Sequence, residues 1–414
     1  MANTMTRIMK NTSRLSGVTL IELIVAVTIS SVLLLGVGSV YYNSKRTYNV
    51  QQEFAQLQEG ARFAVRFMVD DIRMAGFVGC AYNNDFNQAP KFVSFLNGAG
   101  TPENDTAIAN FAVAITGYEA TTSGPGEVID LAAPPAAYSG AILPNFFNPP
   151  PLPGSDILIA RFAGNNSTRL NRNKVAANFS IADVGAPPAL DANNCNPASG
   201  ICQGQILLAT NCQKVRLFQA TALVLGAVAG EIDIFHDAGP ALPGNAVVLW
   251  GGAASPDTFE VSDTYLFQAV SNAYYVAINP NGEPSLYRME MQPGAVANEL
   301  INGVESMQIL YGIDTDKNLL DGNELTDSGD GTANAYVTAN NVVAANENIV
   351  SVRISLLIRT TNEVSTKSTV APVTQNYLMA GISAADGTTV TSPADRRQRK
   401  VFTTTVKLRN KGIP

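Results

Sequence analysis

The side chains best suited to bind a metal ion gather in one acidic segment of the C-terminal third of the chain. Five residues there carry oxygen ligands: Asp314, Asp316, Asn318, Asp321 and Glu324. The first three stand at alternate positions, which is how a loop wraps a hard cation such as Ca2+. The segment is not an EF-hand, because Leu319 stands in place of the turn glycine and Leu325 in place of the bidentate glutamate. A calcium site and a solvated acidic hairpin both remain open.

Catalytic chemistry has little support in this chain. His236 is the only histidine, and its acidic neighbour Asp237 follows it directly rather than facing it as in a Ser-His-Asp arrangement. The chain has no GxxxxGK[ST] loop, no GxSxG elbow and no HExxH motif. The net charge of −7 gives no cluster of basic residues for nucleic acid. The sequence therefore predicts neither an enzyme nor a nucleic-acid partner.

Glu22 is the remaining residue whose position calls for a chemical role. It is the only charged side chain between residues 18 and 44, in an apolar run long enough to span a bilayer. A carboxylate there costs up to about 2–3 kcal/mol, so it normally marks a functional partner. If the chain is cut after Gly17, the new amine of Val18 in a neighbouring copy can neutralise Glu22. The alternative is a glutamate that reaches out to the lipid headgroups.

The flanks of this run set its orientation. Three basic residues and no acidic residue precede it: Arg7, Lys10 and Arg14. This excess predicts that the N-terminus lies inside and the rest of the chain outside. A cleavable secretory signal would have a shorter apolar core and a small-residue site after it, whereas Ser16 and Gly17 precede the core. Cleavage at Gly17 would therefore keep the anchor.

The elements that position these residues are one long helix and many strands. Apolar residues recur at three- and four-residue steps after the membrane run, so the pattern predicts one continuous helix over 18–76, with 18–40 in the membrane. Gly76 then ends it. Short apolar runs predict strands over 155–162, 205–211, 230–237, 246–252, 264–270, 273–279, 285–291, 348–361 and 400–410. Residues 298–316 are expected to begin as a short helix and continue as a strand. The fold class is α+β, a long helix packed on a β-rich head.

All four cysteines fall on the side of the membrane that the basic leader assigns to the periplasm, where thiols oxidise. Four cysteines permit three connectivities. The short loop between Cys195 and Cys202 is rich in turn formers and would close easily, leaving Cys80 for Cys212. A zinc site is the alternative, although the chain lacks a CxxC motif.

The N-terminal string resembles that of the prepilins, whose members carry a short basic leader ending in Gly, then an apolar residue and TLIEL. Here Gly17 and Val18 are followed by Thr19-Leu20-Ile21-Glu22-Leu23, with Val18 where the family usually has Phe. The resemblance implies that a prepilin peptidase cuts after Gly17 and that Val18 is N-methylated. It also implies that Glu22 serves in subunit recognition and assembly.

Later segments extend the resemblance to the PilW-type minor pilins of type IV pili. They include GVESMQILYGID, NIVSVRISLLIRT and RRQRKVFTTTVKLRN in the C-terminal half. We therefore expect a leader over 1–17, the helix over 18–76, and a β-rich head in two parts, 77–297 and 298–414. Family members imply a role in priming pilus assembly, and hence in adhesion and twitching motility. The alternatives are a J-type pseudopilin of type II secretion and a tip adhesin.

The resemblance also implies partners and locations. The partners are other minor pilins, the major pilin and the prepilin peptidase. The chain would first be a single-pass inner-membrane protein with a periplasmic head, and then part of the fibre at the cell surface. No cofactor is expected apart from the possible Ca2+.

Overall fold

A computed structural model describes most of the chain. The described residues are 17–79, 92–97, 111, 113–135, 147–173, 178–182, 190–238, 243–251, 257–261, 263–290, 296–315, 331–342, 349–363 and 372–410. The chain forms two compact units, Met1–Ala55 and Gln56–Pro414. We describe each unit by itself.

The first unit is dominated by an apolar stretch of helix. The helix α1, Leu20–Met74, has 55 residues and continues into the second unit. It is long and apolar enough to cross a membrane, and its apolar side chains in the first unit, such as Leu35 at 75% exposure, are largely exposed. A long apolar surface without a protein partner is what a lipid-facing segment presents.

In the second unit the rest of α1 buries one stripe. Its buried residues follow three- and four-residue steps: Leu57, Ala61, Ala64, Met68 and Ile72. The predicted amphipathic stripe is thus confirmed. The end of the helix is capped from far away in sequence, because Asn410 Nδ2 donates to the carbonyl oxygens of Met74, at 3.2 Å, and Ala75, at 3.4 Å. Gly76 then takes a positive φ of 81°, which ends the helix.

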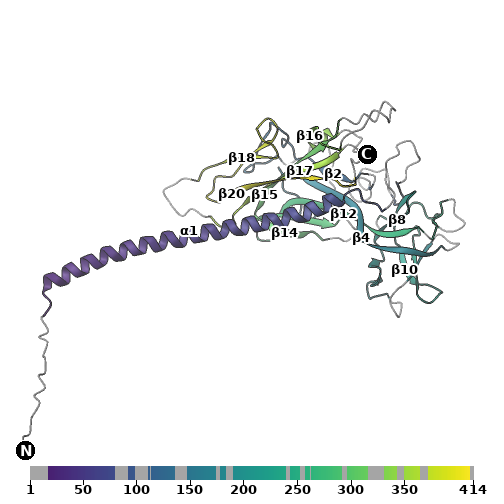
Figure 1. Cartoon of the computed structure of the whole chain (residues 1–414), viewed down its shortest axis with the longest axis horizontal. Helices are drawn as coiled ribbons and strands as arrows, with labels where there is room; N and C mark the ends of the chain where they lie inside the picture. Colours follow the sequence, from purple (N-terminus) through teal and green to yellow (C-terminus); the bar gives the residue numbers. More distant parts are fainter. Residues whose placement is uncertain are drawn as a thin grey trace, which may run out of the picture. The chain divides into compact units, whose positions relative to one another are not determined.

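The larger sheet is built around two long antiparallel strands, β4 (Ile157–Asn173) and β12 (Tyr265–Ile278). Its path runs β1-β9-β8-β12-β4-β5-β11-β10, with β2 added on β4 and with β13 and β14 beyond β12. The other strands are β1 (Phe92–Ser94), β2 (Ile115–Tyr118), β5 (Asn178–Ala182), β8 (Ile206–Thr210), β9 (Val215–Gln219), β10 (Ala222–Leu225), β11 (Glu231–Phe235), β13 (Pro284–Glu290) and β14 (Asn298–Asn302). In Figure 1 the strands β8 and β10 lie near one end of β4, and the strands β15 and β17 lie near its other end.

Three smaller sheets complete the described part of the head. The four-stranded sheet has the order β16-β15-β17-β20, in which the central strands are β15 (Val304–Ile313) and β17 (Ile349–Arg359). Its edges are β16 (Ala335–Val337) and β20 (Arg399–Lys407), and a 3-10 turn, η2, covers Ala339–Asn341. A three-stranded sheet joins β18 (Asn376–Met379), β19 (Thr388–Thr391) and β3 (Val128–Asp130), and a hairpin joins β6 (Cys195–Asn196) to β7 (Ile201–Cys202).

The described residues form five buried apolar clusters, of which two are the largest. The first, here called the helix core, joins the buried stripe of α1 to side chains of β4, β12, β13, β15, β17 and β20. The second, here called the aromatic lobe, contains residues of β5, β8, β9, β11 and the segment around Trp250. The long strands β4 and β12 supply residues to both clusters, so they connect the helix core to the aromatic lobe.

Some predicted elements differ from the structure. Residues 264–270 and 273–279 were predicted as two strands but form one, β12, because the polar pair between them is buried: Asn272 donates to the Asp71 carboxylate of α1 at 2.7 Å. The predicted strand over 246–252 is wrong, since residues 246–251 contain only one isolated bridge, at Gly251, which takes a positive φ of 81°. The helical start at residue 298 is also wrong, because these residues pair with β13 as β14.

Candidate functional site

The residues predicted to act in assembly lie at the start of α1. Thr19 precedes the helix, and its backbone N–H donates to Glu22 Oε2 at 2.9 Å. The Thr19 hydroxyl donates to the same oxygen at 2.8 Å, and the Glu22 N–H points back to Thr19 Oγ1 at 3.3 Å. This is a capping box, in which the first turn of the helix satisfies its own donors. Glu22 therefore has a local partner in Thr19.

This capping box refines the interpretation of Glu22. A carboxylate in the first turn is also favoured by the positive end of the helix dipole. Gly17 and Val18 extend beyond the cap, where Val18 is 75% exposed and nothing lies within 4 Å of a Cβ built on Gly17. Sequence reasoning missed Thr19, although its position three residues before Glu22 is the standard signal of a capping box.

A second polar cluster fastens the C-terminal part of α1 to the sheet. Asp71 accepts hydrogen bonds from Asn272, at 2.7 Å, and from the Tyr274 hydroxyl, at 2.5 Å. Arg288 Nε lies 3.2 Å from the same carboxylate oxygen. Because β12 and β13 supply these partners, Asp71 fixes the rotation of the helix on the sheet.

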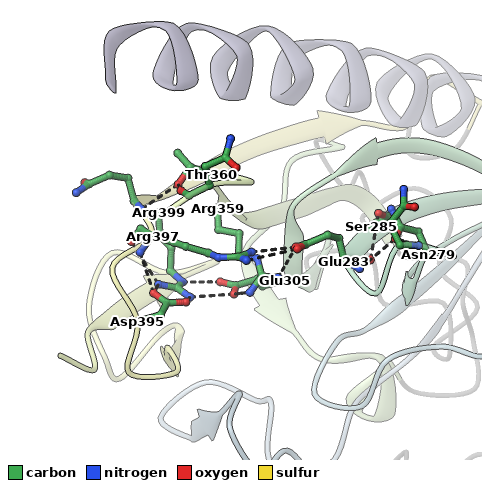
Figure 2. Close-up of polar contacts among 12 residues, drawn as sticks. Asn279, Glu283, Ser285, Glu305, Arg359, Thr360, Asp395, Arg397 and Arg399 are labelled. Carbon is green, nitrogen blue, oxygen red and sulfur yellow. Dashed lines mark hydrogen bonds and ion pairs between the residues drawn. The ribbon is translucent and has the colours of Figure 1, made fainter. Parts of the chain in front are cut away.

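The third cluster is a balanced network of charges beneath the helix core. It contains three arginines and three carboxylates, which Figure 2 shows pointing toward one another: Arg359, Arg397, Arg399, Glu283, Glu305 and Asp395. Glu305 lies at its centre and accepts from Arg399 Nε at 2.6 Å and from Arg359 Nη1 at 2.9 Å. The side chains of Arg399 and Glu305 are only 2% and 5% exposed.

The network ties four segments of the head together. Arg359 at the end of β17 also reaches Glu283, before β13, at 2.5 Å, and Arg397 reaches the same carboxylate at 2.9 Å. The hydrogen bond from Arg397, with Arg359 beside it, holds the pKa of Glu283 below its usual range. Buried charges are tolerated when each is paired and hydrogen-bonded, as here.

The other predicted site residues are distributed as follows. Cys195 and Cys202 form a disulfide across the β6–β7 hairpin. Cys212 is disulfide-bonded, whereas Cys80 lies outside the described residues. His236 is fully buried, with its ring centroid 4.4 Å from that of Trp250.

The acidic segment is described at only one of its five predicted calcium ligands. Asp314, at the end of β15, is 3% exposed, and its carboxylate accepts the N–H of Gly331 at 3.0 Å. The other four lie outside the described residues: Asp316, Asn318, Asp321 and Glu324. Within the described ranges, no group of three His, Cys, Asp or Glu side chains could hold a metal ion.

Two protein-family models match this chain, one near its N-terminus and one in its C-terminal part. The family described as Prokaryotic N-terminal methylation motif matches residues 13–38, which include Gly17, Val18 and Glu22. The family described as Type IV Pilus-assembly protein W matches residues 273–410, which include the whole charge network. This chain is a PilW-like pilin of the type IV pilus. No curated protein and no solved structure shows a significant match.

The assignment gives the pilin's general role. A pilin is a structural protein that is anchored in a membrane by its N-terminal helix and interacts with other pilus components, and the apolar part of α1 suits this anchoring. The matched residues 273–410 begin within β12 and include β13, β14, β15, β16, β17 and β20. Much of the aromatic lobe lies outside the match.

Proposed function

We propose that this pilin is a minor subunit that helps to initiate type IV pilus assembly. The observation that carries the proposal is that one chain joins an N-terminal methylation motif to a PilW-type C-terminal region. The first supplies a means of entering a fibre through helix packing, and the second links the head to pilus assembly. The head lies on the periplasmic side of the inner membrane before assembly and on the fibre afterwards.

The capping box gives the helix terminus a defined role in this scheme. Cleavage after Gly17 places a new amine on Val18, one residue before Thr19, and this amine is then N-methylated. Thr19 keeps the Glu22 carboxylate at the first turn, where it faces the terminus of an arriving copy. A charge that would be costly in lipid is thereby matched by an opposite charge at the same depth.

Counting fibres on cells tests the proposal. A strain lacking this chain should make far fewer pili, and the wild-type chain should restore them. Glu22→Ala should fail to restore them while its level in the membrane is unchanged, and Gly17→Glu should accumulate as uncut precursor. Asp70→Ala, which changes an exposed carboxylate of α1, is the matched control and should restore fibres fully. Normal piliation without the chain, together with a defect in protein secretion, would instead identify a pseudopilin.

A further inference from the structure

Two buried carboxyl groups outside the charge network lie close together where the two main sheets meet. Glu119 follows β2 and is 4% exposed, and Asp156 precedes β4 and is 2% exposed. Asp156 Oδ2 accepts the N–H of Ile309 on β15 at 2.8 Å. Glu119 Oε2 accepts the N–H of Ala339 in η2 at 3.2 Å. The pair therefore links the larger sheet to β15 and its neighbouring turn.

The hydroxyl of Ser123 lies between the two groups. Its Oγ is 2.8 Å from Glu119 Oε1, 3.1 Å from Asp156 Oδ1 and 2.6 Å from the carbonyl oxygen of Ala120. A hydroxyl has one proton to donate, so it cannot satisfy three acceptors. A proton on one carboxyl group would make that group a donor and would complete this set of hydrogen bonds.

The surroundings favour a proton over a metal ion in this position. Three backbone N–H groups point at the carboxyl oxygens, from Ala120 at 3.0 Å, from Ile309 and from Ala339. Each donor takes up one lone pair of a carboxyl oxygen, and two carboxyl groups supply fewer ligands than the roughly six to eight oxygens that Ca2+ takes. The other titratable groups that face the pair are Glu127 on the same loop and Tyr311 on β15. Among the described residues, no basic side chain forms an ion pair with either carboxylate.

The electrostatics agree with this proton count. Burial raises the pKa of Glu119 to about 7, and the nearby negative charge of Glu127 adds to the rise. Burial and the neighbouring Glu119 also raise the pKa of Asp156 well above its usual value. Two buried carboxylates without a cation cannot both ionise at low cost.

We propose that Glu119 and Asp156 share one proton near neutral pH and form a pH-sensitive joint between the larger sheet and β15. When the shared proton leaves, two negative charges face each other across Ser123 and push the loop 119–127 away from β15 and η2. The sign follows from linkage: the folded chain holds a proton that the unfolded chain releases above about pH 4.5. Stability therefore falls as the pH rises from about 4.5 to about 7.

Thermal or chemical unfolding of the full chain in detergent micelles tests the joint. The wild type and Glu119→Gln are compared between about pH 4.5 and about pH 8. Glutamine keeps the shape and the acceptor for Ala339 but cannot ionise. Relative to the variant, the wild-type unfolding constant should rise on the order of a hundredfold over this range. Asp130→Asn, at an exposed carboxylate on β3 that is not among the groups facing the pair, is the matched control and should keep the wild-type pH dependence. Parallel profiles for wild type and Glu119→Gln would overturn the proposal.

A spectroscopic measurement covers the case in which Glu119→Gln fails to fold. Infrared difference spectra of the wild type between about pH 5 and about pH 8 should show the loss of a protonated carboxyl band. Amide exchange should increase at residues 119–127, 309 and 339 over the same range and remain constant in the aromatic lobe. If no protonated carboxyl disappears over this range, the pair does not titrate near neutral pH and the proposal is wrong. Stabilisation by added Ca2+ that is lost in Glu119→Gln would also contradict it, because the site would then take a cation.

Discussion

The helix core and the aromatic lobe differ in the polar groups that they bury and in how these groups are paired. The helix core is largely aliphatic and lies against a network of paired charges centred on Glu305. The aromatic lobe packs the rings of Phe179, Phe218 and Phe259 around Trp250, and its one histidine is fully buried among them. The family match includes the charge network and leaves most of the lobe outside.

This difference also gives the two regions opposite responses to pH. Burial lowers the pKa of His236 to about 4, so protonation works against the folded lobe. Burial raises the pKa of Glu119, beside the helix core, to about 7, so ionisation works against that region. Acid should therefore loosen the lobe first, and loss of the shared proton should loosen the junction of the sheets first.

Removing the centre of the charge network should have the largest effect. Glu305→Ala leaves Arg399, which is 2% exposed, with only Asp395 as a carboxylate partner, and should lower the free energy of unfolding by about 3–5 kcal/mol. Denaturant unfolding of the full chain in micelles measures the change. The matched variant in the lobe is Asp257→Ala, which removes a 24% exposed partner of Lys214 and Arg216 and should cost about 1 kcal/mol. Equal losses would mean that the two regions do not differ in this respect.

Lowering the pH should have the second-largest effect, and it should destabilise the aromatic lobe more than the helix core. His236 is neutral in the folded chain, whereas the unfolded chain binds a proton below about pH 6.5, so stability falls as the pH drops from about 6.5 to about 4. The loss should approach about 2–3 kcal/mol and should disappear in His236→Phe. Amide exchange at β5, β9 and β11, compared with β15 and β17, gives the regional measurement. A loss of exchange protection that begins in β15 and β17 would contradict the expected difference between the two regions.

The disulfide of the lobe should have a smaller and more local effect. The double variant Cys195→Ser, Cys202→Ser opens a loop with a sequence separation of 7 and should cost about 2 kcal/mol. Exchange should increase in β6 and β7 and around Ile201, which packs into the lobe. The exchange of α1 residues 57–74 serves as the internal control and should stay as in the wild type.

The smallest effect is expected at the surface of α1. Arg66 and Asp70 form an ion pair of 3.9 Å between side chains that are 83% and 64% exposed. Arg66→Ala should change the free energy of unfolding by no more than about 0.5 kcal/mol, because water screens the pair. A loss as large as that of Glu305→Ala would show that exposed charges on the helix matter as much as buried ones.

Local sequence pattern was enough to predict α1 and the two strands β17 and β20. Helical spacing gave the buried stripe from Leu57 to Ile72, and the apolar runs gave β17 and β20 within one or two residues at most ends. The turn between β12 and β13 was likewise signalled by NPNGEP. The stripe of α1 shows as a helical period, and β17, buried along most of its length, shows as a continuous apolar run, so both patterns are visible locally.

Long-range polar contacts explain what the sequence could not predict. The second half of β4 reads as a polar loop, NNSTRLNRN, yet it is held in the sheet by pairing with β5 and β12. The charge network brings Glu283, Glu305 and Arg399 together from three separate segments, and no local pattern signals such a meeting. Glu119 and Asp156 are likewise 36 or more residues from several of their partners, such as Ile309. Only the Thr19–Glu22 cap was available from local spacing.

The cap that Asn410 places on the end of α1 has a consequence for biosynthesis. Its side chain reaches Met74 across a sequence separation of 336 residues, so the end of α1 is capped by the last described residue. Leu408, two residues earlier, is also buried in the helix core. During synthesis the apolar stripe of α1 therefore lacks the part of its cover that β20 supplies until β20 has been made. The order of synthesis thus makes β20 a late step in completing the helix core, and a chain truncated before β20 would leave part of that stripe exposed.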